Sequence, residues 1–122
     1  MTLNPEKAAL RKHLLEKRDS TSFDLMEIHS EKILSKLMKT KVISEAKSIA
    51  CYYSIGSEVQ TVKLITQLLD EKKSVSLPRI SSNTMSFRTI DDLSKLDKGE
   101  FDIPEPKDNA PIQEKHDVIL VP

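Results

Sequence analysis

The first apolar positions of the chain recur at helical spacing. Leu3, Leu10 and Leu14 fall within one narrow arc of a helical wheel, as one side of a helix does. Asn4-Pro5 precedes this pattern and favours a helix start, because asparagine accepts free amide protons and proline suits the first turn. Ser20-Thr21-Ser22 then interrupts the pattern and opens a second helix. Its expected stripe is Met26, Ser30, Ile33, Leu34 and Leu37. Ile28 falls off this stripe, so the second helix is either buried on two sides or exposes Ile28.

Strand and helix signals alternate in the middle of the chain. Residues 48–53 predict a strand buried on both faces. Thr61 is placed to cap a third helix. The expected inward side of that helix is Val62, Ile65, Leu68 and Leu69. Residues 75–77 predict a second strand that ends at Pro78, and residues 85–90 predict a third.

The rest of the chain sets the fold class. Residues 91–111 predict a long connection, because they hold Pro104, Pro106 and Pro111. The apolar run at residues 117–121 is typical of a central parallel strand. This order of elements predicts an α/β fold with a mostly parallel sheet flanked by helices. Because a central strand needs cover on both faces, we expect residues 1–122 to be the N-terminal part of a single α/β domain that continues further.

Composition narrows the function classes. The 122 residues fit one domain, and 19 basic residues balance 19 acidic ones, which argues against a nucleic-acid-binding module. Two glycines exclude a glycine-rich phosphate loop within these residues, and a single cysteine excludes a disulfide framework. No apolar run approaches the ~20 residues that span a bilayer. We therefore expect a cytoplasmic protein with no membrane partner, while the sequence carries no signal of oligomeric state.

Two cations on the first helix are candidates for anion binding. Lys7 and Arg11 lie one turn apart, and Arg18 continues their row two turns later. The row borders the leucine side of the helix instead of the far, solvated side. Two cations placed in this way suit a phosphate group. The lysine ammonium would act as a compact charge, and the planar arginine guanidinium would donate paired hydrogen bonds. The alternative is that both side chains extend over core residues with their charges in water.

The turn after the first strand holds further candidates. Glu58 follows a strand and a glycine turn, where α/β proteins place binding residues, and a carboxylate there accepts hydrogen bonds from a heterocycle. The alternative for Glu58 is an interaction with the dipole of the following helix. Tyr53 either stacks on a ligand or is itself a core residue. Cys51 is expected to be a small core residue. The stiff segment Phe101–Pro106 is either a binding loop or a structural one.

Six segments of the chain together resemble one family. In chain order they are residues 7–11, 50–61, 77–79, 85–87, 101–106 and 117–122. They occur in the order and with the gaps seen in 5-formyltetrahydrofolate cyclo-ligase, also called methenyltetrahydrofolate synthetase. The resemblance covers nearly the whole chain.

This resemblance implies an ATP-dependent enzyme of one-carbon metabolism. In that family, ATP phosphorylates the formyl oxygen of 5-formyltetrahydrofolate. A neighbouring nitrogen then attacks the activated carbon, and phosphate leaves as 5,10-methenyltetrahydrofolate forms. Magnesium accompanies the ATP and offsets charge on the transferred phosphoryl group. By the resemblance, Lys7 and Arg11 match ATP-contacting positions. The positions that match the folate pocket are Tyr53, Glu58, Met85 and Phe101.

The chain departs from the family pattern in two places. Asp102 stands where many members have glycine. Members also continue beyond the equivalent of Pro122 into a segment that holds most phosphate and magnesium contacts, so we expect the catalytic residues to lie mostly there. An alternative function is therefore a non-catalytic nucleotide- or folate-binding protein, or an interaction protein, that has lost the phosphate-binding segment.

Overall fold

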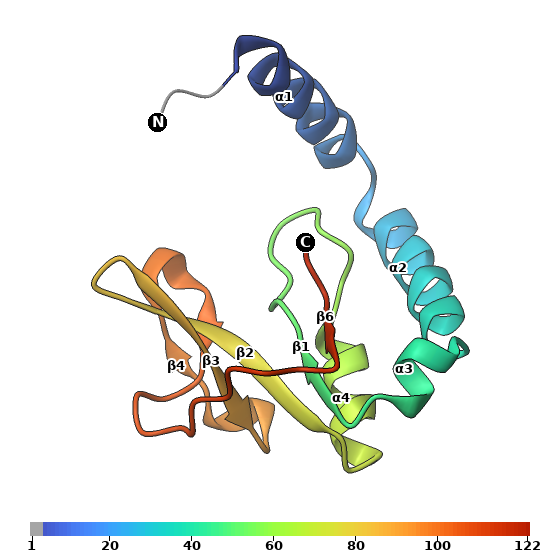
Figure 1. Cartoon of the computed structure of the whole chain (residues 1–122). Helices are drawn as coiled ribbons and strands as arrows, with labels where there is room; N and C mark the ends of the chain where they lie inside the picture. The colour runs from blue at the N-terminus through green and yellow to red at the C-terminus, as the bar shows by residue number, and fades with distance from the viewer. Residues whose placement is uncertain (1–3) are drawn as a thin grey trace.

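Helices form both the N-terminal part and one side of the molecule (Figure 1). The computed structural model describes residues 4–122, so Leu3 lies outside the described residues. The helices are α1 (Pro5–Asp19), α2 (Phe23–Met38), α3 (Lys41–Glu45) and α4 (Val62–Asp70), with short 3-10 turns η1 (Leu93–Lys95) and η2 (Glu100–Asp102). The strands are β1 (Ser48–Ala50), β2 (Ser74–Ser81), β3 (Thr84–Ile90), β4 (Asp97–Lys98), β5 (Pro104–Glu105) and β6 (Val118–Ile119).

Local side-chain caps start the first two helices where the sequence predicts them. The Asn4 carboxamide oxygen accepts hydrogen bonds from the amides of Glu6 and Lys7 at the start of α1. The Ser22 hydroxyl accepts the amide of Leu25 at the start of α2. Ile28 is 48% exposed, so α2 is not buried on two sides.

A four-stranded sheet in the order β3-β2-β1-β6 carries the fold, as predicted for a mixed α/β domain with a mostly parallel sheet. β1 pairs in parallel with β2 and with β6, while β2 and β3 form an antiparallel hairpin. Ser82 and Asn83 turn this hairpin with φ angles of 49° and 65°, the two-residue turn that matches the twist of the strands. The carboxyl ends of β1, β2 and β6 therefore lie at one edge of the sheet.

The hydrophobic core lies between the helices and the middle of the sheet. Its buried members are Ile43, Ala46, Ile49, Cys51, Leu64, Ile65, Leu68, Val75 and Leu77. Cys51 is fully buried, as the sequence predicts. The predicted inward position of Val62 is wrong: Val62 is 38% exposed, and Leu64 is buried in its place.

Two further predictions are wrong because tertiary contacts override local signals: the capping bond of Thr61, although α4 does begin directly after this residue, and the strand end at Pro78. Thr61 makes no side-chain cap on α4. Its hydroxyl instead donates to the Tyr52 carbonyl at 2.9 Å and accepts the Ser54 amide at 3.0 Å. Pro78 does not end the second strand, which continues to Ser81. The Ser76 carbonyl bonds to β1, so the nitrogen of Pro78 faces the same side, beyond the last residue that pairs with β1. No ladder bond is lost there.

The segment predicted as a long connection has structure of its own. β4 and β5 form a small antiparallel pair beside the main sheet. Asp102 has a φ of 59°, so the aspartate adopts the left-handed conformation that favours the glycine found in many family members.

The last strand differs from the central, doubly buried one that the sequence predicts. Within residues 4–122, β6 pairs with β1 alone, and Ile119 and Val121 are 52% and 78% exposed. The Asp117 carboxylate anchors this strand, because it accepts the amides of Lys47 and Ser48 at 2.8 and 3.3 Å.

Candidate functional site

A cleft of about 540 Å³ lies between α1 and the loop that joins β1 to α4. It is lined by Lys7, Leu10, Arg11, Leu14, Leu15, Arg18, Glu58 and Pro122. In Figure 1, α1, this loop and the C-terminus all lie toward the same end of the molecule. This is the end at which the parallel strands finish, where open α/β sheets commonly bind ligands.

One side of the cleft is cationic, because α1 presents three of its bases there. Lys7, Arg11 and Arg18 recur on one side of the helix, and the structure places all three in the cleft lining. Among the described residues that line the cleft, Glu58 is the one with a side-chain carboxylate. Three cations against one anion favour a negatively charged ligand, and the leucines between them supply an apolar surface.

Glu58 is held by the tight turn that precedes it. Its Oε1 accepts the amide of Ile55 at 2.9 Å, and its own amide donates to the Ile55 carbonyl at 3.2 Å. Gly56 adopts a φ of 55° in this turn. Of the two carboxylate oxygens, Oε1 carries the hydrogen bond within the described residues, which leaves Oε2 to a ligand.

The other candidate folate residues do not line this cleft. Tyr53 is half-buried and packs against the hydrophobic core, in line with the core alternative for this residue. Met85 is 59% exposed on β3, and Phe101 is 80% exposed in η2 with a φ of 61°. The structure thus brings Lys7, Arg11 and Glu58 together, and it leaves Tyr53, Met85 and Phe101 outside their cleft.

A buried carboxylate connects the Phe101 segment to the main sheet. Glu105 is 6% exposed, and its Oε1 lies 3.7 Å from Nη1 of Arg79. Its Oε2 accepts the amide of Ile80 at 3.3 Å, and Ile80 pairs with Met85 across the hairpin. Two motifs that are distant in sequence, at Arg79 and at Phe101–Pro106, are therefore joined near the carboxyl end of β2.

The two residues directly after β1 have shifted pKa values but serve the structure. Burial raises the pKa of Tyr52 to about 12, and its phenol donates to the Val59 carbonyl at 2.8 Å. Burial likewise raises the pKa of Cys51 to about 12, so its thiol stays protonated and is a poor nucleophile. Neither residue is suited to acid–base chemistry near neutral pH.

Sequence analysis missed Ser57 and a second cavity. The Ser57 hydroxyl accepts a hydrogen bond from Nε of Arg18 at 2.8 Å and donates to the carboxylate of Asp19. No sequence signal links Ser57 to α1, because the contact depends on how α1 is placed in space.

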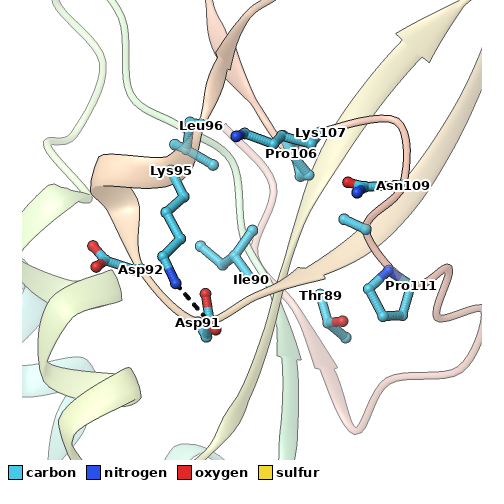
Figure 2. Close-up of a pocket in the computed structure, with 11 residues that line it drawn as sticks. Thr89, Ile90, Asp91, Asp92, Lys95, Leu96, Pro106, Lys107, Asn109 and Pro111 are labelled. Carbon is cyan, nitrogen blue, oxygen red and sulfur yellow. Dashed lines mark ion pairs between the residues drawn. The ribbon is translucent and has the colours of Figure 1, made fainter.

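The second cavity, of about 390 Å³, opens between the end of β3 and the loop at residues 106–111 (Figure 2). Ile90, Leu96 and Pro106 form its apolar surface, while Lys95 reaches Asp91 at 3.8 Å across its rim. Ile90 pairs with Val75 near the start of β2, so this cavity lies at the edge of the sheet opposite the α1 cleft.

Over residues 4–122, no group of three or more His, Cys, Asp or Glu side chains is arranged to hold a metal ion. Within the same range, no helix combines the length and the apolar character needed to cross a membrane.

Comparisons with known proteins identify the family of the chain. A sequence model of the 5-formyltetrahydrofolate cyclo-ligase family matches residues 3–122. A sequence search of curated proteins found no significant match. The NMR structure of 5,10-methenyltetrahydrofolate synthetase from Aquifex aeolicus is similar, with a TM-score of 0.84 and 30% identity over 94% of this chain and 59% of that one.

A second solved structure, a 5,10-methenyltetrahydrofolate synthetase from Mycoplasma pneumoniae, has a TM-score of 0.58 and 30% identity over 69% of this chain. The present chain spans 59% and 53% of the lengths of these two structures. The family match over residues 3–122 shows that the chain belongs to the 5-formyltetrahydrofolate cyclo-ligase family.

Proposed function

We propose that this chain supplies the nucleotide-contacting helix and part of the folate site of an ATP-dependent 5-formyltetrahydrofolate cyclo-ligase. The observation that carries the proposal is the cleft in which Lys7 and Arg11 face the same space as Glu58. A phosphate-suited pair and a carboxylate suited to a heterocycle are thus placed on opposite walls. This arrangement fits a reaction that transfers a phosphoryl group from ATP to a folate.

The proposed reaction has two steps. The γ-phosphoryl group of ATP moves to the formyl oxygen of 5-formyltetrahydrofolate, and ADP leaves. A neighbouring nitrogen of the folate then attacks the activated carbon, and inorganic phosphate departs as 5,10-methenyltetrahydrofolate forms. Lys7 and Arg11 bind and orient the phosphates, since fixed cations offset charge that is already present on ATP and spreads during transfer.

In the proposal, Glu58 binds the heterocycle of the folate, and three aromatic or apolar residues line the rest of its site. Oε2 of Glu58 accepts N–H groups of the heterocycle, while Oε1 keeps its bond to Ile55. We propose that Tyr53, Met85 and Phe101 form a wider wall of the folate site. The support for Met85 and Phe101 is their exposure and the link through Glu105, which fixes the Phe101 segment beside the residue that pairs with Met85.

Magnesium does not fit the described residues as a protein-held ion. Mg²⁺ is usually bound by one or two carboxylates together with substrate phosphates. Glu58 carries the one side-chain carboxylate among the described cleft residues; its Oε1 accepts a backbone amide, and the proposal gives its Oε2 to the folate. No step of the proposal is therefore routed through a metal ion held by residues 4–122.

Calorimetry on the 122-residue chain with ATP and with 5-formyltetrahydrofolate tests the proposal. We expect ATP binding that weakens in Arg11→Ala, with little change in thermal stability because Arg11 is exposed. Lys12→Ala is the matched control, because Lys12 lies on α1 outside the cleft lining. Equal ATP affinity in Arg11→Ala and the parent chain would contradict the nucleotide assignment. Formation of methenyltetrahydrofolate by this chain would contradict the non-catalytic alternative.

A further inference from the structure

Apolar packing holds α1 only weakly against the rest of the protein. Of its residues, Pro5 to Asp19, none is buried. Leu10 and Leu14 face the cleft but are 58% and 52% exposed. Since the free energy gained by packing scales with the apolar area removed from water, these leucines contribute little to the position of the helix.

The hydroxyl of Ser57 joins the last turn of α1 to the body of the protein. Nε of Arg18 donates to it at 2.8 Å, and the same hydroxyl donates to the carboxylate of Asp19. Because both partners are charged, these hydrogen bonds belong to the stronger class. A single side chain thus contacts two successive residues at the end of the helix.

The loop that carries Ser57 is itself well fixed. The turn from Ile55 to Glu58 is closed by the two hydrogen bonds between these residues. Two residues later, the amide of Gln60 donates to the hydroxyl of Ser30 on α2 at 2.9 Å. Ser57 therefore connects α1 to a loop that is held to the rest of the molecule by hydrogen bonds of its own.

The contact lies at one end of α1, and the first candidate cation lies near the other. Lys7 precedes Arg18 by 11 residues of helix, a lever of about 16 Å at 1.5 Å per residue. A rotation of roughly 10° about the Ser57 contact would move Lys7 by about 3 Å on this lever. A shift of that size takes a cation out of contact with a phosphate oxygen.

We propose that Ser57 is a positioning residue that sets the width of the cleft between α1 and Glu58, and thereby the affinity for ATP. Its role in ATP affinity rests on the function proposed above. Ser57 itself touches no substrate; it acts through Arg18 and Asp19 on the place of Lys7 and Arg11.

The position of α1 can be measured without any ligand. Spin labels at Lys12→Cys on α1 and Asp70→Cys on α4 report the distance between the two helices, since both sites are exposed while Cys51 is fully buried. We expect a narrow distance distribution in the parent chain and a broad one in Ser57→Ala. Ser57→Thr keeps a hydroxyl and should restore the narrow distribution. Ser20→Ala is the matched control, because the Ser20 hydroxyl bonds within α1, to the Lys17 carbonyl.

Ligand affinities then test the consequence. We expect the dissociation constant for ATP to rise roughly three- to tenfold in Ser57→Ala, with unchanged affinity for 5-formyltetrahydrofolate. Ser57→Thr and Ser20→Ala should bind ATP like the parent chain. A purely structural role would instead weaken the binding of both ligands together.

The outcomes separate this proposal from the function on which it rests. Equal distance distributions in Ser57→Ala and the parent chain would overturn the positioning role, whatever the ligands do. A broad distribution with unchanged ATP affinity would overturn the link between helix position and nucleotide binding. Failure of the parent chain itself to bind ATP would refute the proposed function and the affinity claim, while the distance measurement would still decide the role of Ser57 in placing α1.

Discussion

A Cβ atom placed on Gly99 would lie 2.3 Å from Cδ of Glu105. The backbone of residue 99 therefore passes directly over the buried carboxylate that contacts Arg79 and the amide of Ile80. Glycine at this position lets the β4–β5 pair close over Glu105. The same closure fixes the segment that exposes Phe101.

The first prediction is that Gly99→Ala destabilises the protein. The new methyl group collides with the Glu105 side chain, and overpacking of this kind costs about 1–3 kcal/mol. Urea denaturation of the variant and the parent chain measures the loss. In a Glu105→Ala background the collision is absent, so Gly99→Ala should cost much less there. An equal cost in both backgrounds would show that Glu105 is not what excludes a side chain at residue 99.

The second prediction concerns the charge of Glu58. Glu58→Gln keeps an oxygen to accept the Ile55 amide and removes the negative charge from the cleft. We expect binding of 5-formyltetrahydrofolate to weaken by about 1–3 kcal/mol, the range for a lost hydrogen bond to a charged group. Calorimetry measures this change. Glu16→Gln, on α1 but outside the cleft lining, should bind like the parent chain. Unchanged folate affinity in Glu58→Gln would leave Glu58 with a structural role alone.

The third prediction is a loss of stability in mild acid that depends on His116. Neither ring nitrogen of His116 has a hydrogen-bond partner among the described residues, and the ring packs edge-on against Phe87 with centroids 5.3 Å apart. Burial lowers the pKa of His116 below its ordinary value of 6.5. The unfolded chain therefore binds a proton before the folded one does. Stability falls as the pH drops through about 6.5 and levels off below the folded-state pKa.

Denaturation midpoints measured between about pH 8 and pH 5 test this prediction. His116→Phe keeps an aromatic ring beside Phe87 and should flatten the pH dependence in that range. His13→Gln, at an exposed site on α1, should leave the dependence as it is in the parent chain. An unchanged slope in His116→Phe would assign the acid sensitivity to other groups.

The fourth prediction concerns the carboxylate that anchors β6. The amides of Lys47 and Ser48 hold the pKa of Asp117 below its ordinary value of 3.8. A lowered carboxyl pKa contributes stability that is present above pH 3.8 and is lost as the pH falls through the folded-state value. Asp117→Asn should therefore be less stable than the parent chain at neutral pH, with the difference closing in strong acid. A difference that stays constant with pH would contradict a role for the charge.

Local chemistry explains which parts of the fold the sequence predicts. Asn4 and Ser22 act on amides two or three residues away, so the starts of α1 and α2 can be read from neighbouring letters. Thr61 has the same side-chain chemistry, but its hydroxyl is taken by Tyr52 and Ser54, which approach only after β1 and α4 have packed together. A local rule cannot anticipate that competition.

The candidate site likewise contains residues that the sequence predicts and contacts that depend on tertiary packing. The helical row of Lys7 and Arg11 indicates from spacing alone that both bases share one side of α1, and the structure places that side in the cleft. The contact of Ser57 with Arg18 joins residues 39 positions apart, and it depends on the angle between α1 and α2. The burial of Glu105 likewise depends on a glycine six residues earlier and on an ion pair with Arg79, 26 residues earlier. No pattern along the sequence predicts such long-range contacts.

The β2–β3 hairpin has a consequence for the order of folding. Its strands of eight and seven residues are joined by two turn residues, so their pairing closes a short loop and costs little chain entropy. The docking of β6 joins Lys47 to Asp117 across 70 positions and comes at a much higher entropic cost. The hairpin is therefore suited to form before the rate-limiting barrier, and β6 after it. Substitutions at the β6 anchor should accelerate unfolding while leaving the refolding rate nearly untouched.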